Sequence, residues 1–243
     1  MVAQIPSFKH IVATFIALQA ILWAGTAFGE AATDWLDGPK ADIRLISATS
    51  AVGDLEIIPL GIEVRLEDGW KTYWRSPGNA GIPPFVEWGG SENLAEAEFQ
   101  WPAPVRFNYY DIETFGYEKT VVFPVNARIA NTGEGVNLRA RVDLLICDDI
   151  CIPHTFNASL NLPAGPAMPS EHLNLIDRYQ NQVPGDGSRV GLVFEGADVT
   201  GPAANPLIRV AFRAQTPFHA PDLLIEGHED AIFSKPSFTF HDA

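Results

Sequence analysis

Cysteine is almost absent from this chain, since its 243 residues include only Cys147 and Cys151. Disulfides therefore cannot be the main source of stability, which the hydrophobic core has to supply, and a hydrophobic content of 47% permits this. Long apolar runs are also missing beyond the first 29 residues, where no segment is long and apolar enough to cross a bilayer. We therefore expect no stable membrane insertion of the mature chain.

Basic side chains are scarce as well. The 16 Lys and Arg residues face 30 Asp and Glu residues, which gives a formal net charge of -14. A surface of this kind repels phosphate backbones and anionic lipid headgroups. The charge balance thus argues against binding to nucleic acid or to an anionic membrane.

The N-terminus has the pattern of a secretory signal peptide. Lys9 and His10 precede an apolar run at residues 11–23, and small residues follow at 25–32. A membrane anchor or a buried helix is the alternative, but the run is shorter than the roughly 20 residues that span a bilayer. We expect residues 1–29 to be the signal peptide. Export would place both cysteines in an oxidising compartment, where a disulfide can persist.

Alternating apolar and polar residues dominate the chain after residue 40. A period of two indicates strands with one buried face, and Gly, Pro and Asn residues mark turns between the runs. With almost no helical pattern, the sequence predicts an all-β, antiparallel β-sandwich. The clearest runs lie at residues 60–66, 121–129, 136–146 and 156–162.

A change in composition divides the mature chain. We expect one β-sandwich domain at residues 40–163 and a Pro-rich linker at 164–188, in which Ser170 caps a short helix ending near Gln182. A second β domain then follows at 189–243, and we expect it to be truncated because no closing strand is evident. Its predicted strands lie near residues 207–212, 223–225 and 237–240.

Two segments of the first domain are expected to be irregular loops. Residues 76–84 are rich in Pro and Gly, and residues 102–116 form a second loop with several aromatic side chains. Aromatic residues usually serve ordinary packing. On loops they are also suited to covering a reactive group and lifting when a partner docks.

The two cysteines stand in the stretch Cys147-Asp148-Asp149-Ile150-Cys151. A disulfide needs Cα atoms roughly 4.4–6.8 Å apart, so the pair can close only if the chain turns at the Asp residues, which tolerate a reversal. Cys147 has the opposite parity to Ile146 at the end of a long alternating run. We therefore expect Cys147 to point away from the buried face and to lie at the surface of the sandwich.

Three interpretations of this pair compete. It is a redox-active disulfide that a partner thiolate attacks, a structural disulfide, or a metal site in which Cys147, Cys151 and His154 bind Cu(I) or Zn(II). So short a loop gains little entropic stabilisation from a disulfide, which disfavours the structural role. No fourth metal ligand is evident near His154. The spacing favours the redox interpretation without excluding the others.

Four motifs in this order resemble a known family. Residues 68–78 (DGWKTYWRSPG), 101–104 (WPAP), 115–118 (FGYE) and 147–153 (CDDICIP) are similar to the N-terminal periplasmic region of the DsbD/ScsB thiol:disulfide reductases. The resemblance covers roughly residues 40–163, and the tail resembles the second β region of ScsB-like members. It implies an immunoglobulin-like domain in the periplasm that needs no cofactor and no metal.

The resemblance also implies roles for residues and partners. Cys147 and Cys151 would be the redox pair, and we expect Cys151 to be attacked first. The segment 112–116, above all Phe115, would cap the pair, with Tyr73 and Tyr117 completing an aromatic shield. Electrons would come from a membrane-embedded reductase domain and pass to periplasmic thioredoxin-fold proteins.

This sequence departs from the family in two respects. The best-known members have a longer spacer between their cysteines. Neither the transmembrane helices nor the thioredoxin-like C-terminal domain of the family is present, so we expect a fragment or a system whose other parts are encoded separately.

Overall fold

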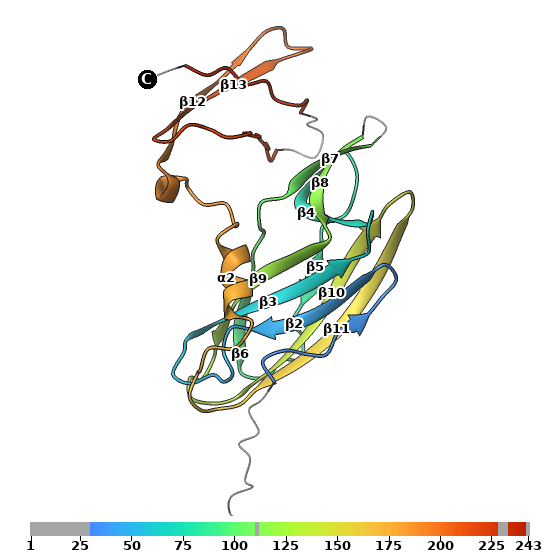
Figure 1. Ribbon diagram of the computed structural model, residues 1–243, viewed down its shortest axis with the longest axis vertical. Helices are drawn as coiled ribbons and strands as arrows, with labels where there is room; N and C mark the ends of the chain where they lie inside the picture. Colours follow the sequence, from blue (N-terminus) through green and yellow to red (C-terminus); the bar gives the residue numbers. More distant parts are fainter. Residues whose placement is uncertain (1–29, 110–111, 228–232, 242–243) are drawn as a thin grey trace, which may run out of the picture.

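The computed structural model describes residues 30–109, 112–227 and 233–241. The expected signal peptide at 1–29 lies outside the described residues. Two antiparallel sheets pack against each other (Figure 1), and the first has the strand order β1-β2-β3-β9-β6. Its strands are β1 Leu36–Asp37, β2 Ala41–Ser47, β3 Ile57–Leu66, β6 Leu94–Phe99 and β9 Thr120–Ile129.

The second sheet has the order β11-β10-β4-β8-β7, and β5 pairs with the middle of β10, at residues 141–143. The predicted all-β, immunoglobulin-like sandwich is therefore confirmed. The strands of this sheet are β4 Lys71–Gly78, β5 Phe85–Glu87, β7 Val105–Tyr109, β8 Ile112–Glu118, β10 Val136–Cys147 and β11 Cys151–Leu162.

The core lies between the sheets and is built from the apolar positions of the alternating runs. On β10 the even-numbered residues from Leu138 to Ile146 are buried, and they face equally buried residues such as Leu60 and Phe123 in the other sheet's strands. Odd-numbered residues of β10 point to the outer face, because successive side chains of a strand alternate. Among the described residues, no helix is long and apolar enough to span a bilayer.

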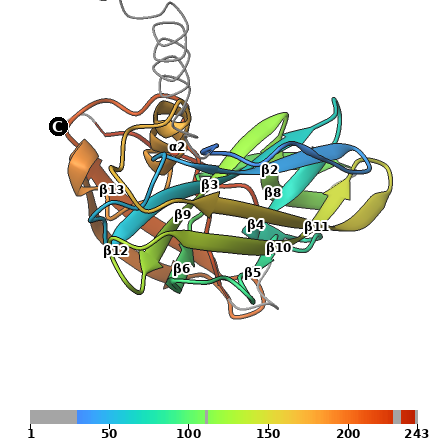
Figure 2. The ribbon, with the colours of Figure 1, turned by 90° about the horizontal axis from the view of Figure 1, so that it is seen from below.

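A short helix fastens the following segment to the sandwich. Helix α2 runs from Leu173 to Gln180 with His172 as its N-cap, so it is shorter than the predicted helix, and Ser170 is not its cap. Ile176 is fully buried against Ile46 and Val122 on the outer face of the first sheet. Figure 2 shows the helix on that side, away from β10 and β11.

The C-terminal region contains one two-stranded sheet, β12 Leu192–Thr200 paired with β13 Leu207–Ala214. It lies beyond the β7–β8 end of the sandwich (Figure 1). The strands predicted at 223–225 and 237–240 were wrong, because neither segment is a strand. Around Leu223 the polar backbone groups are bound by side chains instead, with the amide donating to Asp222 and the carbonyl accepting from Arg106.

The two predicted loops were also partly wrong. Within 102–116 the chain forms β7 and most of β8, and β4 continues to Gly78 before the irregular part begins. The pairing of β4 with β8 shifts register between Tyr73 and Gly78. Gly78 has a φ of 85°, which a glycine adopts without strain, so it can pair with Thr114 after the irregularity.

Candidate functional site

The two cysteines close the end of the longest hairpin in the sandwich. β10 and β11 pair from Val136↔Leu162 to Cys147↔Cys151 without a register shift. The turn between them is held by a hydrogen bond from the Asp148 amide to the Ile150 carbonyl, 2.9 Å long. The Cα atoms of the cysteines are 4.1 Å apart, and the sulfur atoms are bonded. The expected turn therefore brings the pair within bonding distance.

The two ends of this disulfide differ in exposure. Cys151 is exposed, whereas Cys147 is only 1% exposed. The expectation that Cys147 lies at the surface was wrong, because this residue is buried. The direction of its side chain is the one that parity predicts, since Cys147 is absent from the main core cluster. It is buried because the outer face of the sheet is itself covered at this point. An incoming molecule therefore meets Cys151 first.

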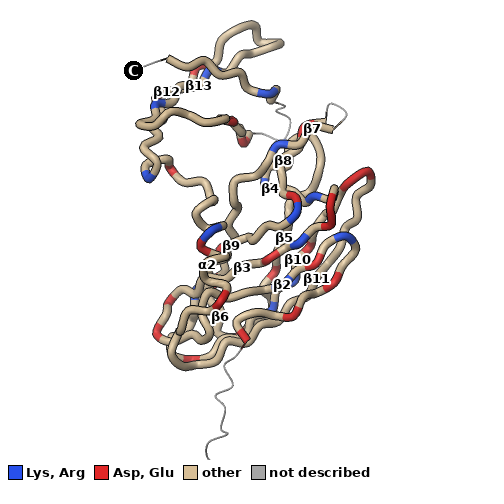
Figure 3. Tube along the Cα trace, in the orientation of Figure 1, with Lys and Arg blue, Asp and Glu red and all other residues tan. Residues whose placement is uncertain are grey.

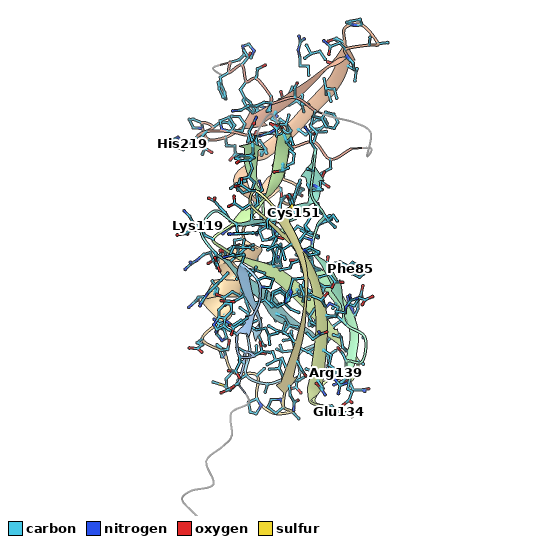
Figure 4. All side chains as sticks on the ribbon, turned by 90° about the vertical axis from the view of Figure 1, so that its right-hand side faces the viewer. Phe85, Lys119, Glu134, Arg139, Cys151 and His219 are labelled. Carbon is cyan, nitrogen blue, oxygen red and sulfur yellow. A yellow bond between two sulfur atoms is a disulfide. The ribbon has the colours of Figure 1, made fainter. Side chains whose placement is uncertain are left out.

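The disulfide belongs to a row of paired residues that crosses four strands. Cys147 pairs with Cys151 on one side and with Lys71 of β4 on the other, and Lys71 in turn pairs with Glu118 of β8. Directly opposed residues of an antiparallel sheet have Cβ atoms about 4.5–5.5 Å apart on the same face. Figure 4 shows Cys151 at the end of its strand, near the β7–β8 part of the molecule.

Two aromatic side chains of β7 lie over this part of the row. The Phe107 ring is 5.2 Å from the Lys71 ammonium, and the Tyr109 hydroxyl donates to Asp149 Oδ1 over 2.8 Å. Tyr109 thus links β7 to the cysteine turn. A pocket of about 190 Å³ opens beside them, lined by Gly69, Trp70, Lys71, Phe107, Asn108, Tyr109, Glu118 and Asp148.

The surroundings of the turn are acidic. Asp148 and Asp149 are both exposed at the tip of the hairpin, and Figure 3 shows this acidic tip. Glu118 is exposed on the neighbouring strand. Lys71 is the single cation among the residues that line the pocket.

Tyr73, one of the three predicted shield residues, lies on the face that carries the disulfide. It is two positions from Lys71 along β4 and is 4% exposed. Gly81 packs so closely on its ring that an added Cβ would lie 2.3 Å from the ring atoms. Burial raises the pKa of Tyr73. The irregular segment after β4 therefore covers Tyr73 beside the row.

Phe115 and Tyr117 face the other way. Both pack against the core, and Tyr117 contacts Phe123 edge to face while its hydroxyl donates to the Pro102 carbonyl over 2.8 Å. Burial raises the pKa of Tyr117 far above its ordinary value. Phe115 lies beneath the guanidinium of Arg106 at 4.8 Å. The structure does not bring these two rings together with the disulfide.

His154 also lies apart from the cysteines. It pairs with Leu144 on the core side of the hairpin and contacts Phe156 edge to face at 4.5 Å. Within residues 30–109, 112–227 and 233–241, no group of three or more His, Cys, Asp or Glu residues is placed to hold a metal ion.

A C-terminal segment, residues 222–226, is bound next to this site. Asp222 accepts two hydrogen bonds from Arg106 of β7, and Glu226 accepts three from Arg75 of β4. Leu224, between them, packs against the core cluster. Arg106 also pairs with Glu113 of β8. The strands that carry Lys71, Phe107 and Tyr109 are thus tied to the C-terminal region.

Comparison with known families decides the assignment of the sandwich. Residues 46–163 match the model of the N-terminal domain of the thiol:disulfide interchange protein DsbD. This segment belongs to the DsbD N-terminal domain family. The matched segment contains both cysteines, Lys71 and all of β7 and β8. Residues 182–243 match a second model, described only as a domain of unknown function (DUF8393).

One solved structure shows a similar fold. The N-terminal periplasmic domain of ScsB from Proteus mirabilis has a TM-score of 0.51 and 24% identity, and the match covers 76% of this chain and 86% of that one. The Neisseria meningitidis DsbD N-terminal domain in the reduced form has a TM-score of 0.29 and 12% identity, over 52% and 90% of the two chains. Comparison with curated proteins finds no significant match.

Sequence reasoning missed Lys71, Phe107 and Tyr109 as neighbours of the disulfide. A signal for the two aromatic residues was present, because Val105, Phe107 and Tyr109 alternate with Arg106 and Asn108. The Pro residues before this run led to its interpretation as a loop. Lys71 had no signal of its own, since its position depends on how β4 pairs with β10.

Proposed function

We propose that this chain is a periplasmic thiol:disulfide interchange module that relays electrons through Cys147 and Cys151. The electrons come from a membrane-embedded reductase domain and pass to periplasmic thioredoxin-fold proteins. One observation carries the proposal: within a DsbD N-terminal domain, the disulfide lies at a hairpin tip with Cys151 exposed and Cys147 buried.

The difference in exposure between the two cysteines determines which sulfur a partner attacks first. A partner thiolate attacks Cys151 Sγ, the bond between the two sulfur atoms breaks, and Cys147 leaves as a thiolate. The partner's second cysteine then attacks the sulfur of the partner's first cysteine in the mixed disulfide. Cys151 leaves as a thiolate, and Cys147 and Cys151 are both reduced. Toward an oxidised client, Cys151 attacks and Cys147 resolves the mixed disulfide, so two electrons pass on and the Cys147–Cys151 bond is restored.

A redox titration of the purified chain tests the proposal. Equilibration with glutathione buffers, followed by alkylation and mass spectrometry, gives the reduction potential of the pair. We expect a value above about -300 mV, because structural disulfides typically lie below it and exchanging pairs above it. A lower value, together with no reduction by a thioredoxin-fold reductase domain, would favour a structural disulfide.

Matched serine variants test the order of attack. Cys147→Ser leaves Cys151 as the free thiol, and Cys151→Ser leaves Cys147. We expect the Cys147→Ser variant to react about tenfold or more faster with an aromatic disulfide reagent, since reactivity follows thiol exposure. The measurement is the rate of release of the coloured thiol at neutral pH. Equal rates, or a faster Cys151→Ser variant, would contradict the proposed order.

A further inference from the structure

We propose that Lys71 stabilises the Cys147 thiolate that forms when the disulfide opens at Cys151. The inference rests on the proposed function and adds to it the residue that sets the ease of opening. Its basis is the row in which Lys71 stands directly beside Cys147, with Glu118 on its far side.

The position of the Lys71 ammonium follows from two contacts. As the cross-strand partner of Cys147, Lys71 has its Cβ about 4.5–5.5 Å from that of Cys147, on the same face. The Phe107 ring, 5.2 Å from Nζ, attracts the cation and keeps it over the sheet. A lysine side chain that starts there is long enough to bring its ammonium to the sulfur of its neighbour.

Opening of the disulfide places a negative charge on Cys147, which the positive charge of Lys71 would stabilise. As the partner sulfur bonds to Cys151 Sγ, the electron pair of the broken bond goes to Cys147 Sγ, and no proton moves in this step. Cys147 is almost fully buried, and burial disfavours a thiolate. A leaving thiol of lower pKa departs faster. A cation at this point therefore speeds the opening of the disulfide.

Acidic groups near the turn oppose the effect of Lys71. Asp148 and Asp149 in the turn and Glu118 on β8 all face this region, and Tyr109 hydrogen-bonds to Asp149. All three carboxylates are exposed, so water and salt screen them. Lys71 is half-buried and directly opposite Cys147, where its charge is screened less. We therefore expect the cation to dominate.

The test is the pKa of the Cys147 thiol, measured by ultraviolet thiolate absorbance in chains that carry Cys151→Ser. Lys71→Met keeps the aliphatic stem and removes the charge, so we expect it to raise this pKa by about one unit, the lower end of the effect of a neighbouring charge. Lys71→Arg keeps the charge and should leave the pKa within a few tenths of a unit of the wild-type value.

Arg139→Met is the matched control for net charge. Arg139 is exposed on the same face of the same strand, about 26 Å from Cys147 at about 3.3 Å per residue, and Figure 4 shows it far from Cys151. This variant should not shift the pKa. Near-ultraviolet circular dichroism checks that each variant is folded, and Lys71→Gln replaces Lys71→Met if that variant is not.

A second readout separates this inference from the proposed function. With both cysteines present, Lys71→Met should slow reduction of the disulfide by dithiothreitol about threefold to tenfold, as expected for a leaving-group pKa raised by about one unit. If the pKa and this rate are unchanged, the inference about Lys71 is overturned while the exchange itself stands. If the wild-type disulfide does not exchange with a thioredoxin-fold partner, the proposed function fails, whatever the pKa.

Discussion

Neighbouring residues of one strand have opposite roles in this domain, because their side chains alternate between the two faces. Glu118 belongs to the row that contains the disulfide, whereas Tyr117, one residue earlier, is buried in the core. The sequence predicted the direction of Cys147 by the same parity. It could not predict the burial of Cys147, because the alternation of β10 carries no information on what packs against its outer face, where β7 contacts Lys71 and the cysteine turn.

Burial of Tyr117 makes the free energy of unfolding of the domain depend on pH in the alkaline range. The unfolded tyrosine ionises near pH 10, whereas burial raises the pKa of the folded tyrosine. Above about pH 10 the unfolded state therefore binds fewer protons, and the free energy of unfolding falls as the pH rises. We expect Tyr117→Phe to cost about 1 kcal/mol at neutral pH, because the Pro102 carbonyl loses its donor.

Urea unfolding at pH 7 and at about pH 10.5 checks this expectation. The Tyr117→Phe variant should lose less stability between the two pH values than the wild type does, since it has no phenol to ionise at this position. A parallel loss in both proteins would show that Tyr117 is not the group responsible.

The β7–β8 hairpin contacts the cysteine turn and Lys71 through the side chains of β7. Its strands are short, at five and seven residues, and it follows a Pro-rich segment. The long alternating runs predicted the sheets of the sandwich correctly, because burial of one face determines their register. The cover over the cysteine turn depends instead on how two short strands dock, which the alternation in each strand leaves open.

Tyr109 connects the β7–β8 hairpin to the cysteine turn through a hydrogen bond that a substitution can remove. Tyr109→Phe removes the hydrogen bond to Asp149 and leaves the ring in place. We expect reduction of the disulfide by glutathione to become about fivefold faster, since a hydrogen bond of this kind contributes about 1 kcal/mol to holding the hairpin over the turn. The measurement is the pseudo-first-order rate of reduction.

Tyr179→Phe provides the control for this substitution. Tyr179 also donates through its hydroxyl over 2.8 Å, but to the Thr120 carbonyl, and it lies on α2. Its loss should leave the reduction rate unchanged. If both variants behave alike, the cover over the turn does not depend on the bond between Tyr109 and Asp149.

Across the whole molecule, the C-terminal region and the sandwich are connected through residues 222–226. Arg106 joins Asp222 to Glu113, and its hydrogen bonds to Asp222 lower the pKa of that carboxyl group. Arg75 holds Glu226. The sequence predicted a separate second domain and gave no sign of this contact, because ion pairs between distant segments have no local pattern. That division of the chain stays a prediction.

Removing both carboxylates tests this connection. We expect Asp222→Asn with Glu226→Gln to increase protease cleavage within residues 215–227 by up to about thirtyfold, because each of the two ion pairs contributes at most about 1 kcal/mol. Mass spectrometry of the fragments gives the rate. Glu195→Gln, which breaks the pair with Arg213 inside the β12–β13 sheet, serves as the control. Unchanged cleavage within 215–227 would mean that Leu224 alone fixes the segment.

The ladder between β10 and β11 has a consequence for repeated turnover. Each strand is 12 residues long, and their main-chain bonds, rather than the sulfur bond, keep the ends of the hairpin together. After reduction the two thiols stay adjacent, so their effective concentration is very high and a mixed disulfide on either one is short-lived. The proposed relay would therefore need no rebuilding of the backbone between one electron pair and the next.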